Sequence, residues 1–175
     1  MKKLIFLLLI TLSTTLMAQK LVVNHGIVKA HTEVFGDSSI NPATTGIISH
    51  LTMGKDITSI KGSVDVSILK LKSDNSDRDE RMAEALESKS YPISTYTFSS
   101  VKKSSHGYLI NGILNFHGVK KPLQIHATIT KHGRKIHFLG KSSFLLSDYK
   151  IKPIKLLFLT VRNKIDLAID VTFKK

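Results

Sequence analysis

The chain has 175 residues, no cysteine and a formal net charge of +13 at neutral pH. This length suits one domain with an ordinary hydrophobic core, and the lack of cysteine excludes disulfides, thiol chemistry and an acylated N-terminal cysteine. The 26 basic residues are spread over expected strands and turns without a basic helix or a base-stacking motif, so no nucleic-acid partner is predicted. The charge favours an anionic membrane surface as a partner, and the alternative is that these residues form an ordinary solvated surface.

The N-terminus is typical of a secretory signal peptide. Lys2 and Lys3 precede an unbroken apolar run over residues 4–10, which fades towards Ala18. We expect residues 1–18 to be removed, which leaves residues 19–175 as one periplasmic domain and lowers the formal charge by two lysines from +13 to +11. The alternative is an uncleaved membrane anchor, although the apolar run is shorter than the ~20 residues that a span requires.

Strand-like sequence follows the signal peptide. Residues 21–34 and 46–53 are extended segments with imperfect alternation, and a turn-rich segment divides them. Residues 60–71 alternate regularly between apolar and polar side chains. A period of two is typical of a strand with one buried face.

One short helix is predicted over residues 77–88. Ser76 with Asp79, or Asp77 with Glu80, supplies a side-chain oxygen for the unpaired N–H groups of a helix start. A proline shortly after this segment ends the helix, because it disfavours helical geometry in the residue before it.

Alternation resumes after the helix and continues almost to the C-terminus. Further alternating segments lie between Pro92 and Phe173, and turns separate them. With the earlier segments they give about eight antiparallel strands in one mainly β domain, without an internal repeat or a domain break. A sheet of about eight strands removes its unpaired edges by closing on itself. The predicted fold is a single antiparallel β-barrel with one inserted helix.

Motifs in this region resemble the YceI-like family. The helix carries an Asn-x-x-Arg-Asp motif, a Tyr-Pro pair opens the next aromatic strand, and a Gly-x-Leu-x-x-His-Gly-Val-x-Lys-Pro hairpin follows. The matching residues are Asn75, Arg78, Asp79, Tyr91, Pro92, Phe98, Gly112, Leu114, His117, Gly118, Val119, Lys121 and Pro122. The chain departs from the family at Arg81, where a histidine is usual, and at Leu86-Glu87, where an aromatic residue is common. The resemblance implies a secreted, lipocalin-like barrel that binds polyisoprenoid lipids.

The resemblance also implies that inward-facing apolar side chains line a lumen for one isoprenoid chain. The expected ligand-binding residues are Val64, Val66, Ile68, Tyr96, Phe98, Tyr108, Ile110, Leu114, Phe116, Ile125, Ala127, Ile129, Phe138, Phe144 and Leu167. Leu123, Ile165 and Ile169 belong to the same inward face. The alternative is that these side chains simply fill the barrel, since alternating apolar residues are typical of a core.

Three basic residues are candidate contacts for a lipid head group: Arg78, Lys120 and Lys121. Arg78 and Asp79 would reach a phosphate if they lay at the mouth of the barrel. We favour Asp79 as a helix cap and Arg78 as an ion-pair partner. Lys120 and Lys121 follow a tight hairpin turn and would attract an anionic group from there.

No catalytic residue, metal site or cofactor is predicted. The eight histidines are scattered, no serine has a nucleophile-elbow context, and Asp148, Asp166 and Asp170 are isolated. The predicted function is therefore non-enzymatic: binding of an isoprenoid chain, either a polyprenyl phosphate or a quinone tail, in the periplasm. The leading alternative is a cell-envelope interaction module with a filled barrel and a basic face, and a metal- or haem-assisted enzyme ranks third. The residues leave the oligomeric state open.

Overall fold

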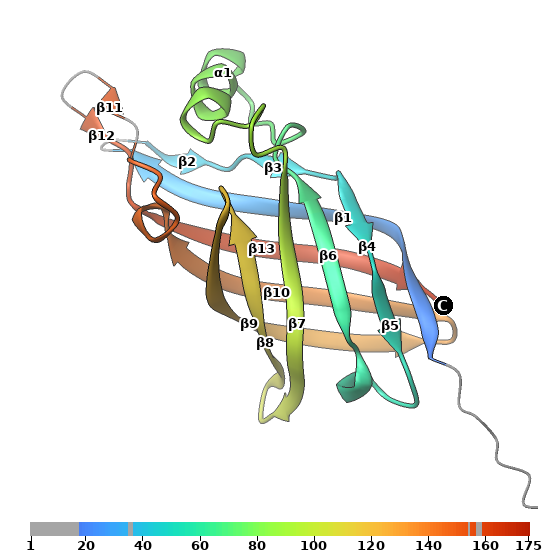
Figure 1. Cartoon of the computed structure of the whole chain (residues 1–175). Helices are drawn as coiled ribbons and strands as arrows, with labels where there is room; N and C mark the ends of the chain where they lie inside the picture. The colour runs from blue at the N-terminus through green and yellow to red at the C-terminus, as the bar shows by residue number, and fades with distance from the viewer. Residues whose placement is uncertain (1–17, 35–36, 154, 157–158) are drawn as a thin grey trace, which may run out of the picture.

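The computed structural model describes residues 18–34, 37–153, 155–156 and 159–175. The predicted signal peptide therefore lies almost wholly outside the described residues. Figure 1 shows a curved antiparallel sheet with one helix at one end. Its elements are β1 (Gln19–Val34), β2 (Asp37–Ile40), β3 (Ala43–Thr44), β4 (Ile47–Ser49), β5 (Leu51–Met53), η1 (Ile57–Ser59), β6 (Gly62–Ser67), α1 (Ser76–Ala85), β7 (Ile93–Ser104), β8 (Gly107–Phe116), β9 (Val119–His132), β10 (Lys135–Leu145), η2 (Leu146–Tyr149), β11 (Lys155–Leu156), β12 (Leu159–Thr160) and β13 (Lys164–Lys174).

The long sheet closes into a barrel through β1. Its strand order is β2-β1-β13-β10-β9-β8-β7-β6-β4, and β5 pairs back with the start of β1, where Leu21 lies opposite Leu51. β4 and β5 are one extended segment interrupted at His50, whose N–H donates to the Ser63 carbonyl at 2.9 Å. If this segment is counted as one strand, about eight strands complete the circuit. The predicted mainly β antiparallel barrel with one inserted helix is confirmed.

β1 serves two neighbours because it changes partner along its length. Its first residues, from Gln19 to Leu21, pair with β5, whereas residues 22–31 pair with β13. The register shifts between Val23 and His25, which is the irregularity expected where a strand bends at a barrel corner. Closure in this way protects backbone groups that would otherwise form an exposed edge.

The start of α1 differs from the sequence prediction. Asn75 is the cap, and its Oδ1 accepts the Arg78 N–H at 2.9 Å, so neither Ser76 nor Asp77 caps the helix. Asp79 is buried, and its Oδ1 accepts two hydrogen bonds from Ser73, from the backbone N–H at 2.7 Å and from Oγ at 2.8 Å. The predicted capping role of Asp79 is wrong in detail, because its carboxylate secures the loop before the helix.

The end of α1 also differs from the prediction. The helix ends at Ala85, and Glu87 takes a left-handed conformation with φ 45°. The Ser88 N–H then donates to the Ala83 carbonyl at 2.9 Å, and the Glu87 N–H donates to the Glu84 carbonyl at 2.9 Å. This pair of bonds is the Schellman pattern, which stops a helix even where no glycine marks the end. No helix within the described residues is long and apolar enough to cross a membrane.

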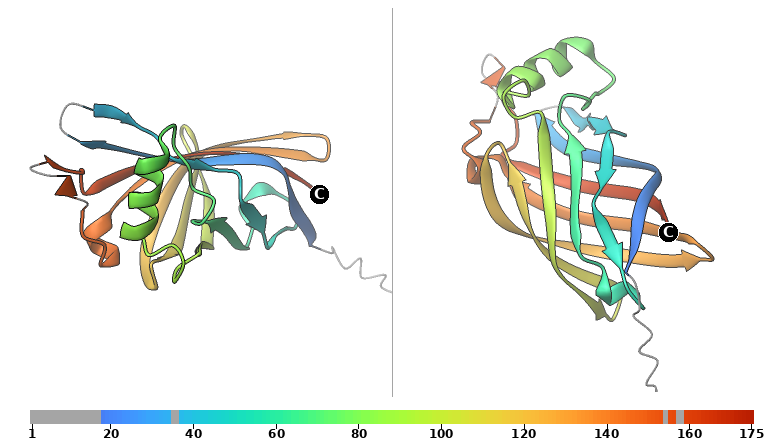
Figure 2. Two further views of the ribbon diagram at one scale, coloured as in Figure 1. Left: turned by 90° about the horizontal axis from the view of Figure 1, so that it is seen from above. Right: turned by 45° about the vertical axis from the view of Figure 1, so that its right-hand side comes forward.

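The two ends of the barrel differ in what covers them. α1, η2 and the β11–β12 hairpin lie at one end, while the β7–β8 turn and the β9–β10 turn lie away from them (Figures 1 and 2). We call the first the helix end and the other the turn end. Tightly packed side chains fill the turn end, among them Leu21, Met53, Ile110 and Ile136, each at most 1% exposed.

Candidate ligand cavity at the helix end of the barrel

The barrel encloses a cavity of about 510 Å³ that lies beneath α1 and extends along β13 as far as Val171 and Phe173. Inward-facing side chains of β1, β6, β7, β8, β9, β10 and β13 form its wall, and one face of α1 covers its mouth. The sequence-predicted residues that line it are Val64, Val66, Ile68, Tyr96, Phe98, Leu114, Phe116, Ile125, Phe138, Phe144 and Leu167, together with Leu123, Ile165 and Ile169. The alternation of the strands thus identified most of the wall.

Four predicted lumen residues do not line the cavity. Ile110, Ala127 and Ile129 are buried in the packed turn end, and Tyr108 packs against the same core opposite Ala127. Alternation reports which face of a strand points inward, but not how far along the strand the hollow part extends. The barrel is therefore packed around Ile110, Ala127 and Ile129 and hollow beneath α1, so each alternative drawn from the sequence describes one part of it.

Helix α1 and the first strand supply wall residues that the sequence prediction missed. Met82, Ala85 and Leu86 lie over the cavity from α1, and Val28 and Ala30 face it from β1. The signal for the helix residues was available, since positions 78, 81, 82 and 85 recur at helical spacing and share one face. The signal for β1 was weak because its alternation is broken by the bulge near His25.

Glycine makes room for an aromatic ring in the wall. A side chain at Gly112 would place its Cβ 2.4 Å from the Tyr96 Cζ atom, so only glycine allows this ring to lie against β8. The Tyr96 hydroxyl then donates to the Leu123 carbonyl at 2.9 Å. Phe98 packs edge-on against the ring at a centroid distance of 5.3 Å. Burial raises the pKa of Tyr96, which keeps the phenol neutral and the wall free of charge at this point.

A second aromatic cluster supports the wall near η2. Phe116, Phe144 and Tyr149 meet edge to face, with ring centroids 5.2 to 5.5 Å apart. Phe116 and Phe144 line the cavity, and Tyr149 is buried behind them at 1% exposure. Burial, and then the nearby Asp148 carboxylate, raise the pKa of Tyr149 to about 12. This wall is therefore apolar and neutral over the whole physiological pH range.

The mouth of the cavity is its polar part. Arg78 and Arg81 line it from α1, beside Asn75 and Asp77. Arg78 pairs with Asp74 at 3.3 Å between Nη1 and Oδ1, which confirms its predicted ion pair. Arg81 was noted in the sequence only as a departure from the family pattern, yet it lines the cavity beside Arg78.

The other two candidate head-group residues lie elsewhere. Lys120 and Lys121 are exposed at the start of β9, opposite Asn115 and Leu114 of β8, and neither lines the cavity. Among the three basic residues selected from the sequence, only Arg78 reaches the mouth. Both lysines lie within three residues of the β8–β9 turn, where β9 begins at the edge of the barrel, and their side chains are exposed outside the cavity.

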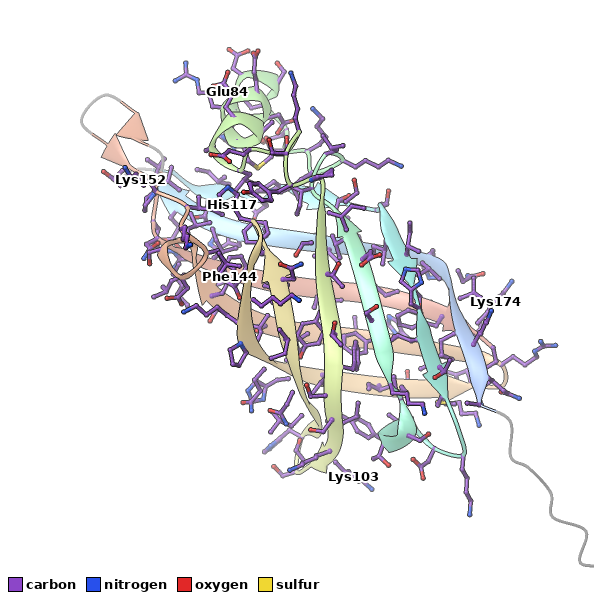
Figure 3. All side chains as sticks on the ribbon, in the orientation of Figure 1. Glu84, Lys103, His117, Phe144, Lys152 and Lys174 are labelled. Atoms are coloured by element: carbon purple, nitrogen blue, oxygen red, sulfur yellow. The ribbon has the colours of Figure 1, made fainter. Side chains whose placement is uncertain are left out.

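His117 lies between α1 and the strands of the barrel (Figure 3). Its Nδ1 donates to the Tyr149 carbonyl at 3.1 Å, and its ring lies 4.2 Å from the ring of Tyr91. Its Nε2 lies 3.3 Å from Oε2 of Glu87, although these two atoms are not aligned as a hydrogen bond. The His-Gly turn, recognised in the sequence only as a hairpin, therefore also fixes the end of α1. Within the described part of the chain, no three His, Asp or Glu side chains gather closely enough to hold a metal ion.

A closed antiparallel barrel with one packed end, one apolar cavity and a helix across the mouth is a lipocalin-like barrel with room for a small molecule. The YceI-like domain model matches residues 21–173, and the chain belongs to this family. The resemblance seen in the sequence motifs is thereby confirmed.

Relatives and solved structures support the same fold. A UPF0312 protein of Shewanella baltica is 33% identical over 104 residues, and Protein YceI of Escherichia coli O157:H7 is 29% identical over 100 residues. These matches cover 54% and 53% of this chain and 54% and 52% of the relatives, so the chain spans about half the length of the relatives it matches.

Among solved structures, Burkholderia cenocepacia BcnA gives a TM-score of 0.74 at 13% identity and covers 84% of this chain and 95% of its own. A polyisoprenoid binding domain from Saccharophagus degradans, implicated in plant cell wall breakdown, gives 0.60 at 10% identity and covers 89% of this chain and 98% of its own. At these identities the similarity is one of fold.

Proposed function

We propose that this protein is a non-enzymatic, exported lipid-binding protein that holds an isoprenoid chain in the cavity at the helix end. The observation that carries the proposal is the cavity of about 510 Å³ with an apolar wall and a polar mouth. A mostly apolar pocket with a few polar groups at one place is the usual form of a small-molecule site. The solved polyisoprenoid binding domain with the same fold supports the choice of ligand class.

The wall favours a long apolar chain over a compact polar ligand. Burial of apolar surface contributes roughly 25 cal/mol per Å², so each isoprene unit that enters contributes on the order of 1 to 2 kcal/mol. The cavity of about 510 Å³ falls within the range of roughly 300 to 1,000 Å³ typical of small-molecule sites. A chain longer than the cavity would leave through the mouth beside α1.

The mouth is suited to the polar end of such a ligand. Two arginines, Arg78 and Arg81, line the cavity where an apolar chain would emerge, and the guanidinium of Arg78 also pairs with Asp74. Guanidinium groups bind phosphate through paired, charge-assisted hydrogen bonds. A polyprenyl phosphate would use both arginines, whereas a quinone tail would use the apolar wall alone.

The direct test is mass spectrometry of lipid extracted from protein purified natively from its own bacterium. We expect an isoprenoid in near-stoichiometric amount. Val66→Phe adds a ring to the cavity wall and should remove that lipid, whereas Ile48→Phe adds the same ring to the exposed outer face and should retain it. Equal lipid in both variants, or only bulk phospholipid in the unaltered protein, would favour the interaction-module alternative.

Export is tested on the same material. The signal peptide proposed for residues 1–18 predicts that the purified protein begins at Gln19, within a few residues. N-terminal sequencing of periplasmic and membrane fractions distinguishes a cleaved periplasmic protein from an anchored one, in which Met1 or the residue after it would be found.

A further inference from the structure

The charge of the molecule is divided between its two ends. Six of the 13 acidic residues belong to α1 and its flanking loops, namely Asp74, Asp77, Asp79, Glu80, Glu84 and Glu87. Glu84 marks this region in Figure 3. The surplus of positive charge must therefore lie mainly elsewhere on the barrel.

Much of that surplus gathers at the turn end. Five basic residues come together there from the β9–β10 turn and the end of β13, and we call them the basic rim: Lys131, Arg134, Lys135, Lys174 and Lys175. Lys135 lies opposite Lys174 across the β10–β13 pair. Arg134 and Lys175 exchange two hydrogen bonds, from Arg134 Nη2 to a terminal carboxylate oxygen of Lys175 at 3.0 Å and from the Lys175 N–H to the Arg134 carbonyl at 3.1 Å.

Further lysines extend the basic rim across the turn end. Lys102 and Lys103 lie at the end of β7, next to the β7–β8 turn. Lys20 lies in β1, two residues before Val22, which is opposite Lys174 of β13. Figure 3 shows Lys103 and Lys174 on the side of the barrel away from Glu84. The basic groups thus occupy several strand ends around the packed half of the barrel.

The lysines of the basic rim have no ion pair with an acidic side chain in the part of the chain that the structure describes. The Lys and Arg pairs of that kind involve Lys72, Arg78, Arg162 and Lys164, none of which lies in the basic rim. Arg134 is the rim residue with an anionic contact, to the terminal oxygen of Lys175. Lys131 lies close enough to Lys175 for mutual repulsion, and the pKa of Lys175 is lowered by loss of water contact and then by that neighbouring charge. A cluster of this kind gains from an external anionic partner.

We propose that the basic rim, with Lys102 and Lys103, docks on the surface of an anionic phospholipid bilayer and leaves the mouth of the cavity facing away from the membrane. Exposed lysines attract anionic bilayers additively within about a Debye length. A nucleic acid fits less well, because none of the described Phe or Tyr side chains is exposed for base stacking and η1 is too short to enter a groove. This inference does not depend on what the cavity holds.

The test compares two variants with equal changes in charge. Lys131→Glu, Lys135→Glu and Lys174→Glu together alter the basic rim, while Lys29→Glu, Lys141→Glu and Lys152→Glu alter exposed lysines on the wall and at the helix end. Partitioning is measured by sedimentation with vesicles of phosphatidylcholine alone and with added phosphatidylglycerol. Each lysine near the surface contributes about fivefold, so the loss of three lysines alone should weaken binding on the order of a hundredfold, and the repulsion of the three glutamates should weaken it further. The matched variant should lose much less, and pure phosphatidylcholine should bind neither.

The orientation is tested separately with a fluorescent label, because the chain has no cysteine of its own. Ser105→Cys places the label at the β7–β8 turn, and Glu84→Cys places it on α1. The label at residue 105 should respond to anionic vesicles, whereas that at residue 84 should not. Equal loss of binding in the two lysine variants, a response at residue 84, or binding of heparin and DNA without binding of vesicles would each overturn the proposal.

Discussion

The Nε2 atom of His117 lies 3.3 Å from Oε2 of Glu87, and both residues hold left-handed backbone conformations, with φ of 50° and 45°. Non-glycine residues rarely adopt this conformation, and they retain it where surrounding contacts compensate for the strain. Here the contacts come from Tyr91 and from the Tyr149 carbonyl. The end of α1, the β8–β9 turn and η2 therefore meet at one imidazole ring, which fixes the helix over the mouth.

Replacement of His117 should loosen this junction. His117→Ala removes the hydrogen bond to Tyr149 and the packing on Tyr91, and it leaves alanine in a left-handed conformation. We expect a loss of about 2 kcal/mol in the free energy of unfolding, measured by urea denaturation. His126→Ala, on the exposed outer face of β9, should change it by less than about 0.5 kcal/mol. Equal stability of the two variants would show that the junction is not stabilising.

Two enlargements distinguish the hollow half of the barrel from the filled half. Val66→Phe projects into the cavity and should leave the melting temperature nearly unchanged. Ala127→Leu enlarges a side chain that is 5% exposed in the packed end and does not line the cavity, so overpacking should destabilise the fold by about 1 to 3 kcal/mol. Calorimetry of both proteins measures this difference. A larger loss of stability for Val66→Phe than for Ala127→Leu would contradict the assignment of the hollow and packed parts.

Asp79 should matter more for stability than the residue that caps the helix. Asp79→Ala leaves the Ser73 N–H without its partner at a site only 6% exposed, which costs about 2 kcal/mol. Asn75→Ala removes an exposed cap and should cost about 1 kcal/mol. Urea denaturation of both variants, with the exposed Glu80→Ala as the control, measures the order. A larger loss for Asn75→Ala would contradict the role assigned to Asp79.

The buried Tyr149 predicts a specific sensitivity to alkali. Its pKa is raised to about 12 in the folded protein, while an unfolded chain ionises its tyrosines near pH 10. Between these values only the unfolded state loses the proton, so folding stability falls as pH rises through this window, by on the order of 2 kcal/mol. Tyr149→Phe removes this contribution. Urea denaturation at pH 9 to 12 should show a shallower decline for the variant, and parallel curves would exclude the effect.

The parts of this molecule that sequence reasoning predicted are those fixed by local pattern. The alternation of Ile110, Leu114 and Phe116 identified the inward face of β8, and the Asn-x-x-Arg-Asp motif located the helix. The cap was assigned wrongly because Asn75, Ser76 and Asp77 are adjacent and each is chemically suited to the role. The conformation of the loop before the helix, which Asp79 holds through its hydrogen bonds with Ser73, determines that Asn75 is the cap.

The limits of the cavity depend on contacts that no local pattern contains. Ile110 and Leu114 occupy equivalent positions in the alternation, yet one is in the packed core and the other faces the cavity. The difference arises from where β9 and β10 extend past β8 and from the place at which α1 crosses the barrel. Both are set by pairings between residues far apart in the chain.

The separation of a packed half from a hollow half gives the barrel unequal tolerance to evolutionary change. Substitutions among the cavity side chains act mainly on the space available to a guest, whereas substitutions around Ile110 and Ile136 act on the stability of the entire fold. A lineage can therefore alter the shape of the cavity by drift at one end while selection preserves the packing at the other.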